Sequence, residues 1–260
     1  MDKYKTKEIK KEIKQNKFTW GIYFLIIIVC WIPALLAFYP IILNYDGVYQ
    51  IQECLTNNMS TRHPILHTLI MSSFYKFGMQ YLGYSDTGMF LFALFQMIIM
   101  AGIYSYAVKF VEEKTNKKWI RNICLIFYAI FPTNQLFPIM TTKDTLFGGF
   151  TLLFVINLYK IYEGKYSKIN YIYLILSSTL MVLFRNNAVY ALIVLIPFIF
   201  LVLIKDRKKL KTMLITVILI LICNQIIYHT LINITNAKLD TNQEKMSIFS
   251  QALAKVCNEK

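Results

Sequence analysis

The chain has 260 residues, of which 57% are hydrophobic, and it carries a formal net charge of +14 with a mean hydropathy of +0.48. A water-soluble domain of this length cannot bury so much apolar surface, so the composition predicts an all-α, polytopic membrane helix bundle. The positive charge does not indicate nucleic-acid binding, because it is gathered in clusters at the ends of apolar segments. Such clusters are typical of cytoplasmic loops beside anionic lipid.

The first apolar segment, residues 18–43, is long enough to cross a bilayer, which requires roughly 20 residues. The segment that precedes it, residues 1–17, contains seven lysines. The apolar run is too long for a signal peptide, and no small-x-small cleavage site follows it. We therefore expect a retained membrane helix with the N-terminus on the cytoplasmic side.

The next polar stretch, residues 44–86, is expected to form a long outer loop. Within it, residues 63–82 are apolar but interrupted by serine, lysine and glycine, and they carry two interfacial tyrosines, Tyr75 and Tyr81. If residues 63–82 crossed the membrane, the basic cluster at 109–121 would lie outside, against the positive-inside rule. We therefore expect 63–82 to form an interfacial juxtamembrane helix and residues 87–110 to form the second crossing.

The remaining apolar segments alternate in direction and complete a bundle of about seven transmembrane helices. They comprise residues 119–139, 145–162, 169–184, 188–204 and 212–232. In this arrangement every Lys/Arg cluster lies inside, while the outer side receives 44–86, 140–144, 185–187 and the tail 233–260. The tail is polar and looks unfinished, which fits a truncated chain. The protein is expected in the plasma membrane, as part of the cell envelope.

Two carboxylates stand out at the outer ends of these segments. Asp46 follows the first helix closely, and it is either a solvated loop or helix-capping residue, or a general base or metal ligand that faces a substrate. Asp144 is either the N-cap of the helix at 145, or a second carboxylate that meets Asp46 across the bundle. A divalent cation between the two is compatible with this pair but is not required.

Four basic or imidazole side chains lie on the same predicted side. Arg185 either snorkels to the surface or binds phosphate through its planar guanidinium, and Lys143 either pairs with a carboxylate or contacts phosphate. His63 and His67 have helical i, i+4 spacing, but no glutamate follows His63 as in H-E-x-x-H, so phosphate contact is favoured over a metal site.

Two further polar residues, Asn134 and Gln135, interrupt the apolar segment 119–139. They either line the same cavity or bond between helices. The five cysteines have no metal-binding or disulfide spacing.

In its order of segments and short motifs the chain resembles the GT-C superfamily of integral-membrane glycosyltransferases, which includes protein mannosyltransferases and aminoarabinose transferases. The resemblance covers residues 18–232, equivalent to the N-terminal seven-helix module of these enzymes. The matching pieces are Tyr45-Asp46-Gly47, His63-Pro64-Ile65-Leu66, Thr142-Lys143-Asp144-Thr145 and Leu183-Phe184-Arg185-Asn186-Asn187.

This resemblance implies transfer of a sugar from a polyprenyl-phosphate-linked donor at the extracytoplasmic face. It assigns Asp46 as the catalytic base or metal-linked acid, Asp144 as the second catalytic acid, and Arg185, with Lys143 and His63, as ligands of the lipid phosphate. Many relatives have a longer acidic pair in the first loop, whereas the next acid here is Glu53. Relatives also continue into further helices.

Two other classes of function remain open at this point. One is a transporter or lipid-handling membrane subunit in which the outer charges form a gate, and the other is a non-catalytic scaffold. A transporter is expected to carry charges at mid-depth in the membrane, whereas here they lie at helix ends, which favours an interfacial enzyme. The expected partners are the lipid-linked donor and membrane lipids, without nucleic acid. The sequence specifies neither the donor sugar nor the acceptor.

Overall fold

The computed structural model describes residues 2–115, 117–163, 168–203, 207–239, 253–255 and 257. Its regular structure over these residues is entirely helical, with two isolated β-bridges and no β-strand. The all-α prediction is therefore confirmed for the described part of the chain. The helices are α1 (Asp2–Ala37), α2 (Tyr45–Leu55), α3 (Ile65–Phe77), the π-helix η1 (Gly78–Leu82), α4 (Ser85–Lys114), α5 (Lys118–Ile130), α6 (Pro132–Leu136), the 3-10 turn η2 (Phe137–Ile139), α7 (Asp144–Tyr162), α8 (Lys168–Phe184), α9 (Ala188–Leu203) and α10 (Arg207–Thr235).

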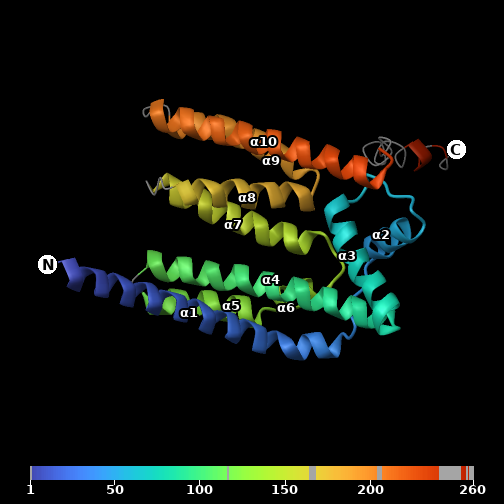
Figure 1. Cartoon of the computed structure of the whole chain (residues 1–260), viewed down its shortest axis with the longest axis horizontal. Coiled ribbons are helices and arrows are strands. Elements are labelled where there is room, and N and C mark those ends of the chain that lie inside the picture. The colour runs from blue at the N-terminus through green and yellow to red at the C-terminus, as the bar shows by residue number, and fades with distance from the viewer. Residues whose placement is uncertain are drawn as a thin grey trace.

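The long helices run along the longest axis of the molecule, and successive ones point in opposite directions (Figure 1). Helix α4 is central and packs on α1, α3, α5 and α7, while α8 joins α7 to α10. The largest buried side chains, among them Trp31, Phe92 and Leu146, fill the space around α4. This packing separates the molecule into two ends joined by an apolar middle.

Four helices are long and apolar enough to cross a membrane: Thr19–Ala37, Ser85–Lys114, Asp144–Tyr162 and Leu210–Thr235. A fifth crossing is obtained if the bent pair Lys118–Ile130 and Pro132–Ile139 counts as one span. Two further apolar helices, Lys168–Phe184 and Ala188–Phe198, are shorter. Among the described residues, length and composition thus support four to five spans rather than the expected seven.

The expectation of one continuous helix over residues 119–139 is wrong. Pro132 disfavours helical geometry at the residue before it, and Phe131 is extended, so α5 ends at Ile130 and the chain bends by 53°. The side-chain amides of Asn134 and Gln135 donate to the carbonyls of Phe127 and Ala129, both at 2.9 Å. These two residues therefore satisfy the freed end of α5.

The end of the first helix also differs from the expected residue 43. Helix α1 ends at Ala37, because Pro40 disfavours helical geometry just before it. The chain then forms an unpredicted helix, α2, in which Gly47, Gln50 and Cys54 are buried. The segment predicted as the first outer loop, residues 44–86, is therefore partly helical.

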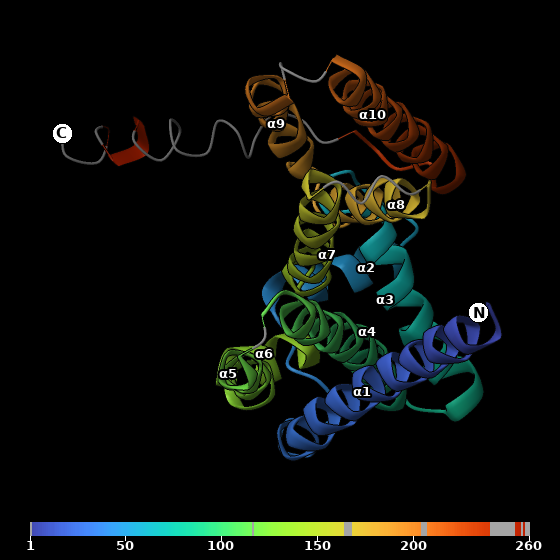
Figure 2. The ribbon, with the colours of Figure 1, turned by 90° about the vertical axis from the view of Figure 1, so that its left-hand side faces the viewer.

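The segment 63–82 lies across the ends of the long helices, as α3 followed by η1 (Figures 1 and 2). Tyr81 is exposed, whereas Tyr75 packs partly buried on the core. The corner between η1 and α4 requires glycine, because a Cβ on Gly78 would lie 2.6 Å from the Cα of Gly88. A transverse segment is the geometry expected of an interfacial helix.

The predicted polar tail, residues 233–260, is only partly described. Helix α10 continues to Thr235, and most residues after 239 lie outside the described part. The start of the tail bonds back to the loop before α3. The N–H of Lys238 donates to the carbonyl of Met59 at 2.8 Å, and the N–H of Thr61 donates to the carbonyl of Lys238 at 2.9 Å.

The two ends of the molecule differ in the residues that they gather. One end holds α2, α3, residues 140–143, the turn 185–187 and the end of α10, and we call it the site end (Figure 1). The other holds the end of α4 and the start of α5, the end of α7 and the start of α8, and the start of α10, and we call it the basic end. The Lys/Arg clusters of the described helices fall at the basic end, and the candidate site residues fall at the site end.

Candidate functional site

The segment that carries Lys143 and Asp144 is held in place by two neighbours. From α4, the fully buried Gln96 donates its side-chain amide to the carbonyl of Met140 at 2.8 Å. Ile42, in the link after α1, forms a short parallel β-bridge with Met140. Its carbonyl accepts the N–H of Thr141 at 3.1 Å, and its N–H donates to the carbonyl of Ile139 at 2.8 Å. The ends of two distant segments are therefore fixed side by side.

Asn44 joins the start of α2 to the same segment. Its side-chain oxygen accepts the N–H of Gly47 at 2.8 Å, as an N-cap does, and also the hydroxyl of Thr141 at 2.7 Å. A Cβ on Gly47 would lie 2.2 Å from the hydroxyl oxygen of Thr141, so only glycine permits this approach. This contact sets Asp46, in the first turn of α2, opposite residue 143.

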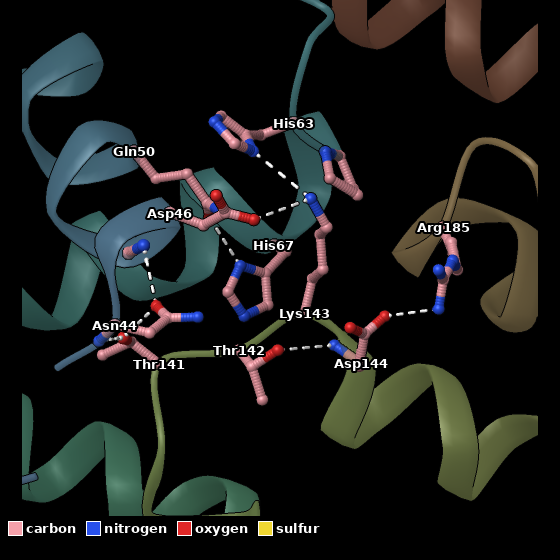
Figure 3. Close-up of polar contacts among 12 residues, drawn as sticks. Asn44, Asp46, Gln50, His63, His67, Thr141, Thr142, Lys143, Asp144 and Arg185 are labelled. Atoms are coloured by element: carbon pink, nitrogen blue, oxygen red, sulfur yellow. Dashed lines mark hydrogen bonds and ion pairs between the residues drawn. The ribbon is translucent and has the colours of Figure 1, made fainter. Parts of the chain in front are cut away.

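Asp46 pairs with Lys143 in the structure (Figure 3). Lys143 Nζ donates to Asp46 Oδ2 at 3.1 Å and lies 3.4 Å from His63 Nδ1. Partial burial raises the pKa of Asp46, but the bond and charge of Lys143, helped by His63 and Arg62, outweigh burial and hold that pKa below its usual value. Asp46 is therefore an ionised carboxylate at neutral pH, with 43% of its side chain exposed.

Asp144 pairs with Arg185 rather than with Asp46. Arg185 Nη1 donates to Asp144 Oδ1 at 2.7 Å, and the guanidinium lies 5.2 Å from the ring centre of Phe147. The expected N-cap role of Asp144 is wrong, because α7 already includes it and Lys143 is the cap residue. The two carboxylates thus belong to two separate ion pairs, which are connected through the neighbouring positions 143 and 144 (Figure 3).

The two histidines do not share a helix face as expected. His63 precedes α3 and lies buried beside Lys143, whereas His67 is fully buried inside α3. His67 Nδ1 lies 2.6 Å from the side-chain oxygen of Gln50, which also accepts the hydroxyl of Thr68 at 3.3 Å. Burial, and then the charges of Lys143 and His63, lower the pKa of His67 to about 3, so its ring is neutral. His67 fixes α2 against α3 and does not reach a ligand surface.

A cavity of about 720 Å³ opens between α3, the α8–α9 turn and α10. Both Lys143 and Arg185 line it, whereas their partners Asp46 and Asp144 are not among its lining residues. The cavity wall also contains residues that the sequence did not single out. The most polar of these are Arg62, Asn224, Gln225 and Tyr228.

The signal that could have revealed the α10 residues is a pair of adjacent amides, Asn224 and Gln225, inside the apolar segment 212–232. Polar side chains within an apolar span usually face other helices or a cavity. The position of α10 against α3 and α8, however, comes from tertiary packing.

A metal site receives no support from the donor set. Among the described residues there is no group of three or more His, Cys, Asp or Glu side chains placed to hold an ion. Each of the two candidate carboxylates is instead bonded to a cationic side chain. A divalent ion between Asp46 and Asp144 remains a prediction from the sequence.

Comparison with known proteins identifies a family but no function. No curated protein and no solved structure matches the chain. The family model that matches covers residues 55–260, which include Lys143, Asp144 and Arg185 but not Asp46. Because the match spans more than half of the chain, the protein belongs to DUF6020, a family of unknown function.

Proposed function

We propose that the protein is an integral-membrane glycosyltransferase that moves a sugar from a polyprenyl-phosphate-linked donor to an acceptor hydroxyl at the extracytoplasmic face. The observation that carries this proposal is the pair of cations, Lys143 and Arg185, which come from separate segments and line one cavity. Each cation is also paired with a carboxylate from another element. A phosphate site with an adjacent base is what this transfer requires.

The cations suit the leaving group of such a donor. A sugar–phosphate–polyprenyl diester carries one negative charge, and its phosphate gains a second as the bond to the sugar breaks. Lys143 supplies a mobile point charge, and Arg185 supplies a planar fork that matches phosphate oxygens. Both stabilise the charge that develops in the transition state.

Asp46 is the proposed base. The acceptor hydroxyl oxygen forms a bond to the anomeric carbon, and its proton passes to the Asp46 carboxylate. The bond from the anomeric carbon to the phosphate oxygen breaks, and its electron pair leaves with polyprenyl phosphate. Asp144 holds the Arg185 guanidinium in position, since the two are bonded at 2.7 Å.

The Asp46–Lys143 pair couples donor binding to base strength. In the unliganded protein Lys143 keeps the pKa of Asp46 low, which makes it a weak base. A donor phosphate competes with Asp46 for Lys143. When Lys143 turns to the phosphate, the pKa of Asp46 rises and its carboxylate becomes a stronger base.

The proposed topology has seven crossings and a cytoplasmic N-terminus. It counts the bent α5–α6 pair and the two shorter helices α8 and α9 as crossings, which the alternating directions of the helices support (Figure 1). A reporter fused after Lys114 should read as cytoplasmic, and one fused near Asn57 should read as external. An external reading after Lys114 would mean that α3 crosses the membrane.

An alternative function is a transporter or lipid-handling subunit without transferase activity. The observation that favours it is that the cavity lies at the junction of two apolar helices, α8 and α9, that are shorter than the candidate spans. Transporters build substrate sites from such interrupted segments. This alternative predicts movement of a lipid or solute across vesicles with no transfer of sugar.

The proposal is tested by following radiolabelled sugar leaving a panel of polyprenyl-phosphate donors, with the full chain reconstituted in vesicles. Asp46→Asn keeps the shape of the side chain but removes the base, so transfer should fall by roughly 100-fold or more at unchanged abundance. Asp86→Asn is the matched control, because Asp86 also lies in the first turn of a helix at the site end. Transfer by Asp46→Asn at the level of Asp86→Asn would exclude Asp46 as the base.

A further inference from the structure

Helix α10 presents a polar stripe to the cavity. The residues of α10 that line it are Asn224, Gln225, Tyr228 and Leu231. The last three follow Asn224 by one, four and seven positions, a spacing that places all four on one face of the helix. The rest of the span Leu210–Thr235 is strongly apolar. Two adjacent amides near the middle of an apolar span are unfavourable unless they bond to a partner.

Asn224 in particular has bonding capacity that its own helix leaves unused. Its side-chain amide donates to the carbonyl of Ile220 at 2.9 Å, one turn back. The residue is only 4% exposed, and its side-chain oxygen, which is buried, makes no hydrogen bond within the described structure. A buried acceptor on a cavity wall is suited to receive a donor group from a ligand.

The charges of the cavity are distributed unevenly between its walls. All three charged lining residues, Arg62, Lys143 and Arg185, come from elements other than α9 and α10. The α9 and α10 walls contribute neutral amides and the rings of Tyr190 and Tyr228. One part of the cavity thus suits an anion, and the other suits a neutral group rich in hydroxyls.

We propose that this face of α10 is a sugar subsite, an inference that rests on the proposed transferase function. Asn224 and Gln225 bond to hydroxyls of the donor sugar, and Tyr190 and Tyr228 present rings against which a sugar can lie. Lys143 and Arg185 hold the attached phosphate at the same time. The α10 residues therefore determine which sugar is accepted, while the cations recognise the lipid phosphate common to all donors.

The test separates recognition of the sugar from recognition of the phosphate. The full chain in lipid nanodiscs is titrated with a polyprenyl phosphate and with the same lipid carrying glucose, mannose or galactose. Gln225→Leu and Asn224→Leu should weaken binding of the best sugar-bearing lipid by roughly 3- to 10-fold, the usual effect of one lost hydrogen bond, and leave binding of the sugar-free lipid unchanged. Gln225 is exposed, so this variant does not depend on repacking of the core.

Thr216→Val is the matched control, since Thr216 is a buried polar residue of α10 that bonds to its own helix and does not line the cavity. It should leave both affinities unchanged. Suppose that wild type binds the sugar-free and the sugar-bearing lipid. If the two leucine variants then weaken binding of the two lipids equally, or leave binding of both unchanged, the sugar subsite is disproved while the proposed function stands. If wild type binds no lipid of the panel, the proposed function itself fails.

Discussion

The two ends of the bundle use the same kinds of charged residue to different effect. At the basic end, Glu112 accepts bonds from the hydroxyl of Tyr23 at 2.9 Å and from Lys109 and Arg121, both at 3.1 Å, and so ties α1, α4 and α5 together. Lys114 pairs with Glu163 and joins α4 to the end of α7. At the site end, Asp46 pairs with Lys143 and Asp144 pairs with Arg185.

The carboxylate side chains at the two ends also differ in their exposure to solvent. The Glu112 side chain is 26% exposed, whereas those of Asp46 and Asp144 are 43% and 40% exposed. A carboxylate bonded to three groups from three helices holds the structure together. A carboxylate whose bonded cation lines a cavity can give up that cation to a ligand. Under the proposed function, the number of helices that a carboxylate ties together, rather than the presence of charge, distinguishes a structural ion pair from one that binds a ligand.

The strongest test of this distinction removes one lysine from each end. Lys143→Met should lower sugar transfer by roughly 100- to 1000-fold, because it removes a cation from the leaving phosphate. Lys114→Met removes a paired lysine at the basic end and should change transfer less than twofold. Both variants are assayed in vesicles at matched protein amounts. Equal loss in the two variants would place Lys143 among the structural charges.

A smaller effect is expected from exchange of arginine for lysine. Arg185→Lys keeps the positive charge but loses the fork, so the KM for the lipid donor should rise by roughly tenfold with a smaller change in kcat. Arg121→Lys, at the basic end, should leave both constants unchanged. Full kinetic curves against donor concentration measure the two constants. A fall in kcat alone would contradict a role in holding the donor.

The close approach that builds the site end should itself be measurable. In Gly47→Ala the new Cβ meets Thr141, so α2 must shift and the protein should lose about 1–3 kcal/mol of stability. Gly148→Ala, on α7, has open space around the added atom and is the control. Thermal unfolding in detergent compares the two. Equal melting temperatures would show that α2 tolerates displacement from residue 141.

The subtlest expected effect is on pH dependence. Asp46, the proposed base, can accept a proton only when ionised, so kcat/KM should be full above its pKa and decline as pH falls through that value. Because Lys143 holds this pKa down against burial, Lys143→Met should move the acid limb to higher pH. Rates over a pH series with wild type and Lys143→Met show the shift. An unmoved limb would mean that another group titrates.

The sequence predicted the helical class and the end at which each charge lies, because apolar length and the position of basic clusters are local properties. It missed α2, although Asn44 as N-cap and Asp46 in the first turn are the usual signals of a helix start. It also missed the break at Pro132, because residues 119–139 were read as one apolar crossing.

The pairing within the site could not be predicted, since it depends on contacts between distant residues. Asp46 and Lys143 are 97 positions apart, and Asp144 and Arg185 are 41 apart. Several arrangements of the same helices would place these charges on one side. The contact of Asn44 and Gly47 with Thr141 sets Asp46 opposite Lys143. The number of candidate membrane spans is limited by the shortness of α8 and α9.

The contact between the start of the tail and the loop before α3 has a consequence for the order of folding. Lys238 bonds to Met59 and Thr61, so this contact joins two segments that lie far apart in the sequence. The chain is synthesised from its N-terminus, so the sequences of α1 to α9 are complete before Lys238 is added. The loop that carries Arg62 and His63 therefore cannot reach its final position until α10 is complete. A nascent chain stopped before α10 should hold most of its helices but lack a finished cavity.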